Sequence, residues 1–307
     1  AMKKHNLILL IIAVALFTLP VIALSAEVII ITSSDIIPYQ KAIEGFKGRL
    51  PQDTFQEYSI NEDIKSQGQF VVERAIKKGG DLILAVGPQA TYLTGRHSSP
   101  IPKVFTMVLN PEKLLNKNNT FPGVSLNLPI ALQLEMIKSG FPKRKRIGVF
   151  YNQKLNQKTI DYTSGKALNL DLLIVGLPIA SQKDIPEILN SPQFNIDILW
   201  VIPDRTVGSE KILKYLIKNM LLKNIPVVGF NEWFTEHGAI LSFSLGYQAI
   251  GRQTAELAQK ILREGNLSEP LIQEPSTVKT IVNLKIARKL SIFISSDLIK
   301  NASEVIK

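Results

Sequence analysis

The residues best suited to chemistry in this sequence stand directly after short apolar runs. Ser33, Ser34 and Asp35 follow the run at 28–31, and Tyr39 comes four residues after Asp35. Hydroxyl groups in this loop could point toward a polar ligand, but Ser34 or Asp35 could instead cap the helix that follows. One residue can serve both purposes, so both interpretations stay open.

A second loop of this kind begins at Gly87, after the run at 82–86, and continues through Pro88, Gln89 and Ala90. A glycine followed by a proline at a helix start leaves backbone N–H groups that point outward and suit a carboxylate. An ordinary strand-to-helix turn has the same pattern. The chemistry that these two loops indicate is the binding of a small polar ligand.

Residue patterns for catalysis are missing. The sequence contains no GxSxG nucleophile elbow, no P-loop, no GxGxxG and no HExxH motif. It has no cysteine, and its three histidines, His5, His97 and His237, are too scattered for a convincing metal site. We therefore expect a binding protein without a cofactor or metal ion, and not an enzyme.

The elements that must position these loops alternate between apolar strands and helices. The 307 residues are 45% hydrophobic and 20% charged, which excludes a disordered chain and a multi-span membrane protein. Strands are predicted at 28–31, 55–60, 82–86 and 104–109, with helices between them. Continuous apolar strands separated by helices are typical of a parallel sheet covered on both faces.

The alternation restarts near residue 128. A helix is predicted at 130–139 and a long helix at 246–264, and further strands are predicted at 147–151, 172–177, 196–202, 227–230 and 278–282. The sequence therefore predicts an α/β fold of two doubly wound, Rossmann-like lobes.

The N-terminal segment predicts export. Lys3 and Lys4 precede an apolar run at 7–17, and small residues follow at 23–26. These are the three parts of a secretory signal, and the run is shorter than the roughly 20 residues needed to span a bilayer. Ala1 before Met2 is left out of this reasoning. We expect residues 1–26 to be a signal peptide, cleaved near residues 25–26, and the protein to be periplasmic without a lipid-modified cysteine.

The formal charge of +10 does not by itself predict a polyanionic partner. Most of the lysines and arginines are spread as single residues, which favours a solvent-exposed, lysine-rich surface. Export also sets aside a nuclear or cytosolic role for the basic run at 143–146. We expect no nucleic-acid partner.

Several segments together resemble one bacterial protein family. They are VFTMVLNP at 104–111, GVSL at 123–126, KRIGVFYN at 145–152, IPVVGFNE at 225–232, GRQTAELA at 251–258 and VNLKIARKL at 282–290. In order and spacing they are similar to the substrate-binding proteins of ABC importers, in the subfamily that includes tryptophan- and phenylalanine-binding members. The resemblance runs from about residue 80 to the end.

This resemblance implies a type I periplasmic-binding fold, with three chain crossings and a ligand cleft between the lobes. The N-terminal lobe is expected at 27–127 plus 244–271, the C-terminal lobe at 128–243 plus 272–307, and the crossings near 126–130, 242–246 and 271–277. The expected ligand-binding residues are Ser33, Ser34, Asp35, Tyr39, Gly87, Pro88, Gln89, Ala90, Met107, Ser125, Asp204, Arg205, Thr206, Asn231 and Glu232.

The sequence departs from the family pattern in the second lobe. Where the family usually has Asp-Asn-Thr, with the acid facing the ligand's ammonium, this chain has Asp204, Arg205 and Thr206. Arg205 could pair with Asp204 or bind an acidic group of the ligand. Met107 and Asn110 also replace the small residues and aspartate that are more common at those positions.

The expected function is that of a periplasmic solute receptor. It would close over a small molecule, such as an amino acid or a related polar or aromatic compound, and deliver it to the permease subunits of an ABC importer. The alternative is an exported ligand-sensing subunit of the same fold that acts on a signalling protein. A monomer is expected in either case.

Overall fold

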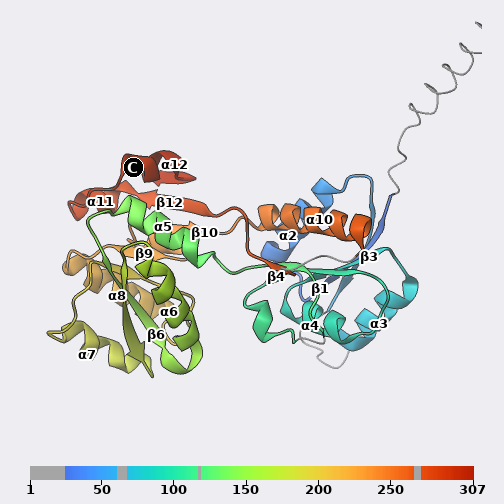
Figure 1. Ribbon diagram of the computed structural model, residues 1–307, viewed down its shortest axis with the longest axis horizontal. Helices are drawn as coiled ribbons and strands as arrows, with labels where there is room; N and C mark the ends of the chain where they lie inside the picture. Colours follow the sequence, from blue (N-terminus) through green and yellow to red (C-terminus); the bar gives the residue numbers. More distant parts are fainter. Residues whose placement is uncertain (1–24, 61–67, 117–118, 266–270) are drawn as a thin grey trace, which may run out of the picture.

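The computed structural model describes residues 25–60, 68–116, 119–265 and 271–307, which form two α/β lobes (Figure 1). The lobes confirm the predicted fold class. Residues 1–24 of the expected signal peptide lie outside the described residues. Within the described ranges, no helix combines the length and apolar character needed to cross a membrane.

The first lobe has a six-stranded sheet whose paired strands all run parallel, in the order β11-β5-β4-β3-β1-β2. Its strands are β1 (Glu27–Thr32), β2 (Thr54–Ser59), β3 (Leu82–Val86), β4 (Lys103–Val108), β5 (Gly123–Ser125) and β11 (Ile272–Gln273). Its helices are α2 (Ile37–Arg49), α3 (Gly68–Lys78), α4 (Pro88–Arg96) and α10 (Tyr247–Glu264), and a short 3₁₀ helix, η1 (Pro111–Lys113), follows β4.

The apolar runs form central strands because they are covered on both faces. Val28 and Ile30 of β1 pack with residues of α2 and α10, whereas Ile29 and Ile31 pack with residues of α3 and α4. Successive side chains of a strand point to opposite faces, so a strand between two helical layers must be apolar throughout.

The second lobe has a seven-stranded sheet in the order β13-β12-β10-β9-β8-β6-β7, in which β12 runs antiparallel to β10. Its strands are β6 (Arg146–Asn152), β7 (Leu173–Ile179), β8 (Ile198–Trp200), β9 (Val227–Gly229), β10 (Leu241–Ser244), β12 (Lys279–Asn283) and β13 (Glu304–Ile306). Its helices are α5 (Ile130–Gly140), α6 (Gln153–Leu168), α7 (Ile185–Asn190), α8 (Glu210–Leu222), α9 (Glu232–Glu236), α11 (Leu284–Lys289) and α12 (Ser296–Asn301), with the 3₁₀ helix η2 (Gln182–Asp184) before α7.

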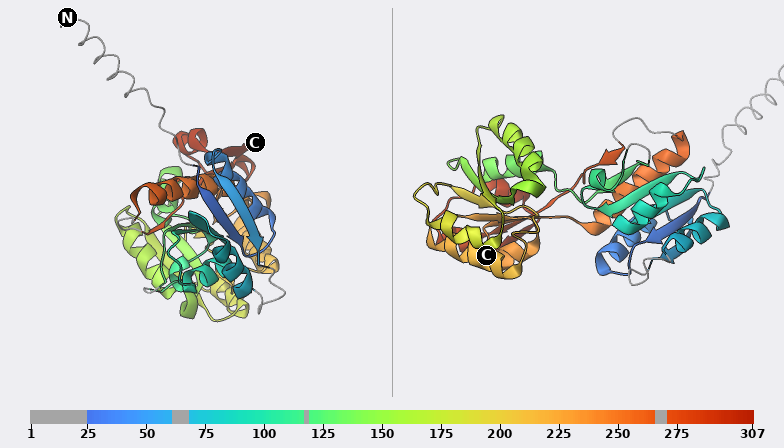
Figure 2. Two further views of the ribbon diagram at one scale, coloured as in Figure 1. Left: turned by 90° about the vertical axis from the view of Figure 1, so that its right-hand side faces the viewer. Right: turned by 90° about the horizontal axis from the view of Figure 1, so that it is seen from below.

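Three chain segments join the lobes, at 126–129, 245–246 and 274–278 (Figures 1 and 2). The first leaves the carboxyl end of β5, the second leaves the carboxyl end of β10, and the third leaves the carboxyl end of β11. Because β5 and β10 run parallel to their neighbours β4 and β9, the carboxyl ends of both sheets lie on the sides that face the other lobe. Strand-end loops of both lobes therefore border the space between them.

Two short strands correct the expected lobe boundaries. Ile272 and Gln273 were assigned to the C-terminal lobe, but they pair with Gly123 and Val124 in the first sheet. Ser244 was assigned to the N-terminal lobe, but it pairs with Lys279 in the second sheet. Backbone pairing decides both positions, and strands of two to four residues have no periodicity that a sequence could reveal.

Helices α2 and α10 pack unusually close together beside the second crossing (Figure 1). A Cβ atom at Gly45 would lie 2.1 Å from the carbonyl oxygen of Gln248, and one at Gly251 would lie 1.9 Å from that of Ala42. Both glycines are therefore required by the close approach of the two helix backbones.

We expect Gly45→Ala to lower the free energy of unfolding by about 1–3 kcal/mol, because the new methyl group must push α10 away from α2. Gly48→Ala is the matched control in the same helix, since a Cβ atom there meets nothing within 4 Å. The control should be neutral or stabilising by up to about 1 kcal/mol. Urea denaturation of both variants measures the difference, and equal stabilities would contradict this account of the packing.

Candidate ligand-binding site

Ser33 joins two strand ends of the first lobe. Its side chain is fully buried, and its hydroxyl group donates to the carbonyl oxygen of Val86 at 3.0 Å. The hydroxyl oxygen of Ser33 also accepts the backbone N–H of Ala90 at 2.9 Å. The hydroxyl group therefore caps α4, and it occupies one of the amides that the sequence analysis assigned to a ligand carboxylate.

Gly87 forms the turn between β3 and α4. Its φ of +87° lies in the region that favours glycine, and a Cβ atom there would lie 2.7 Å from both Ser33 Oγ and Tyr39 Oη. The half-buried Tyr39 ring therefore lies directly against this turn. Pro88 is exposed and Gln89 is half-buried at the start of α4, so both remain accessible from the space between the lobes.

Ser34 and Asp35 do not cap α2. The residue that precedes this helix is Ile36, and no side chain caps its N-terminus. Asp35 is exposed and accepts a hydrogen bond from Gln40 Nε2 at 2.6 Å, and the backbone carbonyl of Ser34 accepts the Thr32 hydroxyl at 2.9 Å. Of the two interpretations left open by the sequence, capping of α2 is wrong.

Met107 and Ser125 shape the ends of β4 and β5 from within. Met107 is the extra residue of a β-bulge, has a φ of 62° and is only 2% exposed, with its side chain in the apolar core under α2 and α10. Ser125 is 1% exposed and accepts the backbone N–H of Asn127 at 3.3 Å. Neither side chain is open to solvent in this arrangement.

Asp204 joins two strand ends of the second lobe. Its Oδ2 atom accepts the backbone N–H of Asn152 at 2.8 Å and the side-chain amide of Asn156 at 2.7 Å. Its Oδ1 atom accepts the backbone N–H of Thr206 at 2.7 Å. The carboxylate is only 6% exposed, and Thr206 Oγ1 also accepts from Asn152 Nδ2 at 3.0 Å.

The partners of Asp204 in this network are neutral amides of the chain. Neutral N–H donors satisfy the carboxylate, and charge-assisted hydrogen bonds of this kind are strong enough to hold a buried anion. Arg205 is exposed and makes no ion pair with Asp204 among the described residues. Asn152 and Asn156 were not predicted as partners, although Asn152 directly follows a predicted strand, as the residues of the other loops do.

Asn231 and Glu232 line a cavity of about 500 Å³ beside the second crossing, which we call the hinge cavity. Both residues are exposed, and Glu232 Oε1 accepts the Ser244 hydroxyl at 3.3 Å. The wall of the hinge cavity includes residues of both lobes and of the crossing. It is lined by Lys41, Asn231, Glu232, Trp233, Ser244, Leu245, Gly246, Tyr247, Gln248, Ala249, Arg252 and Lys279.

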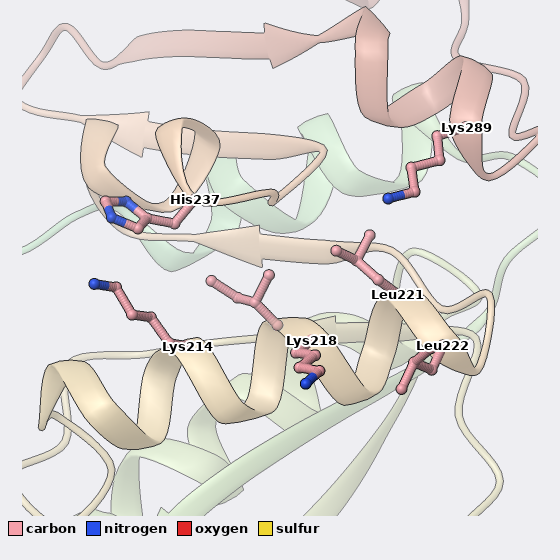
Figure 3. Close-up of a pocket in the computed structure, with 7 residues that line it drawn as sticks. Lys214, Lys218, Leu221, Leu222, His237 and Lys289 are labelled. Carbon is pink, nitrogen blue, oxygen red and sulfur yellow. The ribbon is translucent and has the colours of Figure 1, made fainter.

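A second cavity, of about 250 Å³, lies within the second lobe between α8, His237 and Lys289 (Figure 3). Leu221 and Leu222 contribute apolar surface, and Lys214 pairs with Glu210 one turn earlier, which lowers the pKa of that carboxyl. All its lining residues belong to one lobe. A ligand in this cavity would not contact the other lobe, so it is not a candidate for the ligand cleft.

The described residues contain no group of three or more histidine, cysteine, aspartate or glutamate side chains that could hold a metal ion. The strand-end loops instead offer hydroxyl, amide and carboxylate groups and one exposed guanidinium. These groups can bind a small polar molecule between two lobes.

The architecture and this arrangement of loops define a two-lobe solute-binding protein. Comparison with protein families matches residues 31–306 to the family described as ABC transporter substrate binding protein. Because this match covers both lobes, the chain belongs to that family, as the sequence motifs indicated.

Among curated proteins, the chain is similar to a tyrosine-binding protein of Clostridioides difficile. The two are 24% identical over 223 residues, which cover 70% of this chain and 64% of the relative. The chain thus spans a little less than two thirds of that relative's length.

Two solved structures share the fold. An ABC domain in complex with L-Trp from Streptococcus pneumoniae has a TM-score of 0.59 and 20% identity, covering 92% of this chain and 100% of its own. A ligand-free, open substrate binding protein with adhesive properties from Clostridium difficile has a TM-score of 0.75 and 23% identity, covering 92% and 99%.

The network around Asp204 leads to a prediction about stability. We expect Asp204→Ala to lower the free energy of unfolding by about 2–3 kcal/mol, because it removes three hydrogen bonds to a charged group and leaves their donors without an acceptor. Asp161→Ala is the control, since Asp161 is exposed and accepts only from Gln157. That change should stay within about 0.5 kcal/mol of the wild type in thermal denaturation. A loss no larger than that of the control would show that the network contributes little.

Proposed function

We propose that this protein is the solute receptor of an ABC importer, exported to the periplasm, where it closes over a small ligand as a monomer and delivers it to the permease subunits. The observation that carries the proposal is the family match across both lobes, residues 31–306, joined by three crossings. A ligand that contacts the strand-end loops of both lobes stabilises the closed state by its differential affinity.

The first lobe offers apolar contacts for such a ligand. Ile36 and Ile37 after β1, and Leu109 after β4, are exposed large apolar side chains that follow strand ends. Their positions support a ligand with an apolar or aromatic part. The tyrosine-binding relative and the L-Trp complex support the same class.

The second lobe offers charged contacts for the polar end of the ligand. Arg205 is exposed and is not neutralised by Asp204, so its guanidinium can bind a carboxylate bidentately. Among the described residues, Asp204 Oδ1 accepts one hydrogen bond, and it can accept a second from an ammonium group. We infer that the ligand is an amino acid with an aromatic or large apolar side chain.

A titration with L-tyrosine, L-tryptophan and L-phenylalanine tests this inference. At about 100 times its dissociation constant, a true ligand should stabilise the protein by about 2.7 kcal/mol, and small-angle scattering should show a smaller radius of gyration. Arg205→Gln should weaken binding about tenfold to hundredfold because it removes a charge-assisted contact. Arg288→Gln, an exposed arginine of α11, is the control and should bind like the wild type.

Two results would contradict this proposal in different ways. If none of the three amino acids binds, the ligand class is wrong. If one binds without any change in the radius of gyration, hinge closure is wrong.

The expected cleavage region has two well-placed backbone amides. Ala26 N lies 3.0 Å from Asp53 Oδ1, and Glu27 N lies 2.8 Å from Asp81 Oδ2. Cleavage after Ser25 or after Ala26 would turn one of these amides into an ammonium group beside a carboxylate, which is a favourable contact. These contacts support removal of the signal peptide at either position.

N-terminal sequencing of the protein recovered from the periplasm of an expressing bacterium tests the processing. The mature chain should begin at Ala26 or Glu27. An uncleaved chain that stays with the membrane fraction would show that residues 1–26 act as an anchor instead.

A further inference from the structure

Positively charged side chains outnumber carboxylates in the wall of the hinge cavity. Lys41 comes from α2, Arg252 from α10 and Lys279 from β12, so the three cations stand on three elements and in both lobes. In the described part of the chain, none of the three cationic side chains forms an ion pair or a hydrogen bond. The single carboxylate in the wall, Glu232, accepts the hydroxyl of Ser244.

The packing of α2 against α10 holds two of these cations close together. The backbones touch where Gly251 meets the carbonyl oxygen of Ala42, and Lys41 and Arg252 are the chain neighbours of these two residues. The third cation approaches from the second lobe, because a Cβ atom at Gly246 would lie 3.8 Å from Lys279 Cε. The positions of all three cations therefore follow from backbone packing around the second crossing.

Backbone amides add to this charge. Gly246, Tyr247, Gln248 and Ala249 line the cavity and form the N-terminal end of the 18-residue helix α10, which has no acidic residue in its first turn. The first amides of a helix have no partner within it and favour an anion. Glu44 is the other nearby carboxylate and accepts from Gln248 Nε2 at 3.2 Å.

We propose that the hinge cavity binds a small anion of the phosphate or carboxylate type, held by Lys41 and Arg252 from the first lobe and Lys279 from the second. A cavity of about 500 Å³ is large enough for such an ion. This site does not include the loops around Ser33 and Asp204, although Asn231 and Glu232 of its wall are among the residues expected to bind the cleft ligand.

Anion binding here is coupled to the hinge. The cavity wall comes from both lobes, so hinge movement changes the distance between Lys279 and the other two cations. An anion held by all three favours lobe arrangements in which the three cations stand around one cavity, as they do here. Anion binding therefore shifts the equilibrium between arrangements of the lobes.

Inorganic phosphate is the probe for this site. Calorimetric titration compares the wild type with Arg252→Gln and Lys279→Gln, at an ionic strength held constant with sodium chloride. The controls are Arg288→Gln and Lys211→Gln, which also remove one exposed positive charge each but lie outside the cavity. We expect phosphate binding to weaken at least about tenfold in the two cavity variants and to stay within about threefold in the controls. Thermal denaturation without phosphate verifies that all variants are folded.

Three results would overturn the proposal. The first is a wild type that does not bind phosphate up to about 10 mM. The second is an equal loss in all four variants, which would show only a general effect of net charge. The third is a loss of L-tyrosine affinity in Arg252→Gln without phosphate binding, which would assign these cations to the carboxylate of the cleft ligand. The first two results leave the proposed solute-receptor function untouched.

Discussion

The structure depends on one constraint: the strand that precedes each chain crossing pairs in parallel with a neighbour in its own sheet. Parallel strands end at the same edge of a sheet, so every loop that follows a strand is brought to that edge. Because the chain leaves β5, β10 and β11 at these edges, the two sets of loops are directed toward each other. Binding between the lobes is possible only because both sheets have this orientation.

Each lobe makes its strand-end edge rigid with one buried polar side chain. Ser33 joins the ends of β1 and β3 to the first turn of α4, and Asp204 joins the segment after β8 to the end of β6 and to α6. In both cases a side-chain oxygen accepts N–H groups that would otherwise lack a partner. The residues with the clearest binding chemistry in the sequence therefore organise these loops, whereas Gln89 is half-buried and Arg205 is exposed.

Helix packing positions the residues at the hinge, whereas strand pairing positions the loops of the lobes. Two glycines allow α2 and α10 to touch, and this contact places cations from both helices next to the second crossing. The charge of the hinge cavity thus follows from helix packing and not from a local sequence motif. Because the cavity wall comes from both lobes, the distances between these charges depend on the relative position of the lobes.

The sequence by itself determined the fold class, the family and most of the elements. Continuous apolar runs such as 28–31 and 82–86 can only be central strands covered on both faces, and this periodicity is a local property of the chain. Only the tertiary structure decided the roles of individual polar residues. Asp204 binds amides of the chain, the side chain of Met107 lies in the apolar core at a bulge, and Lys41, Arg252 and Lys279 line one cavity. The Asp204 network joins residues about 50 positions apart, and the packing of α2 against α10 joins residues more than 200 positions apart. No local pattern in a sequence encodes such contacts.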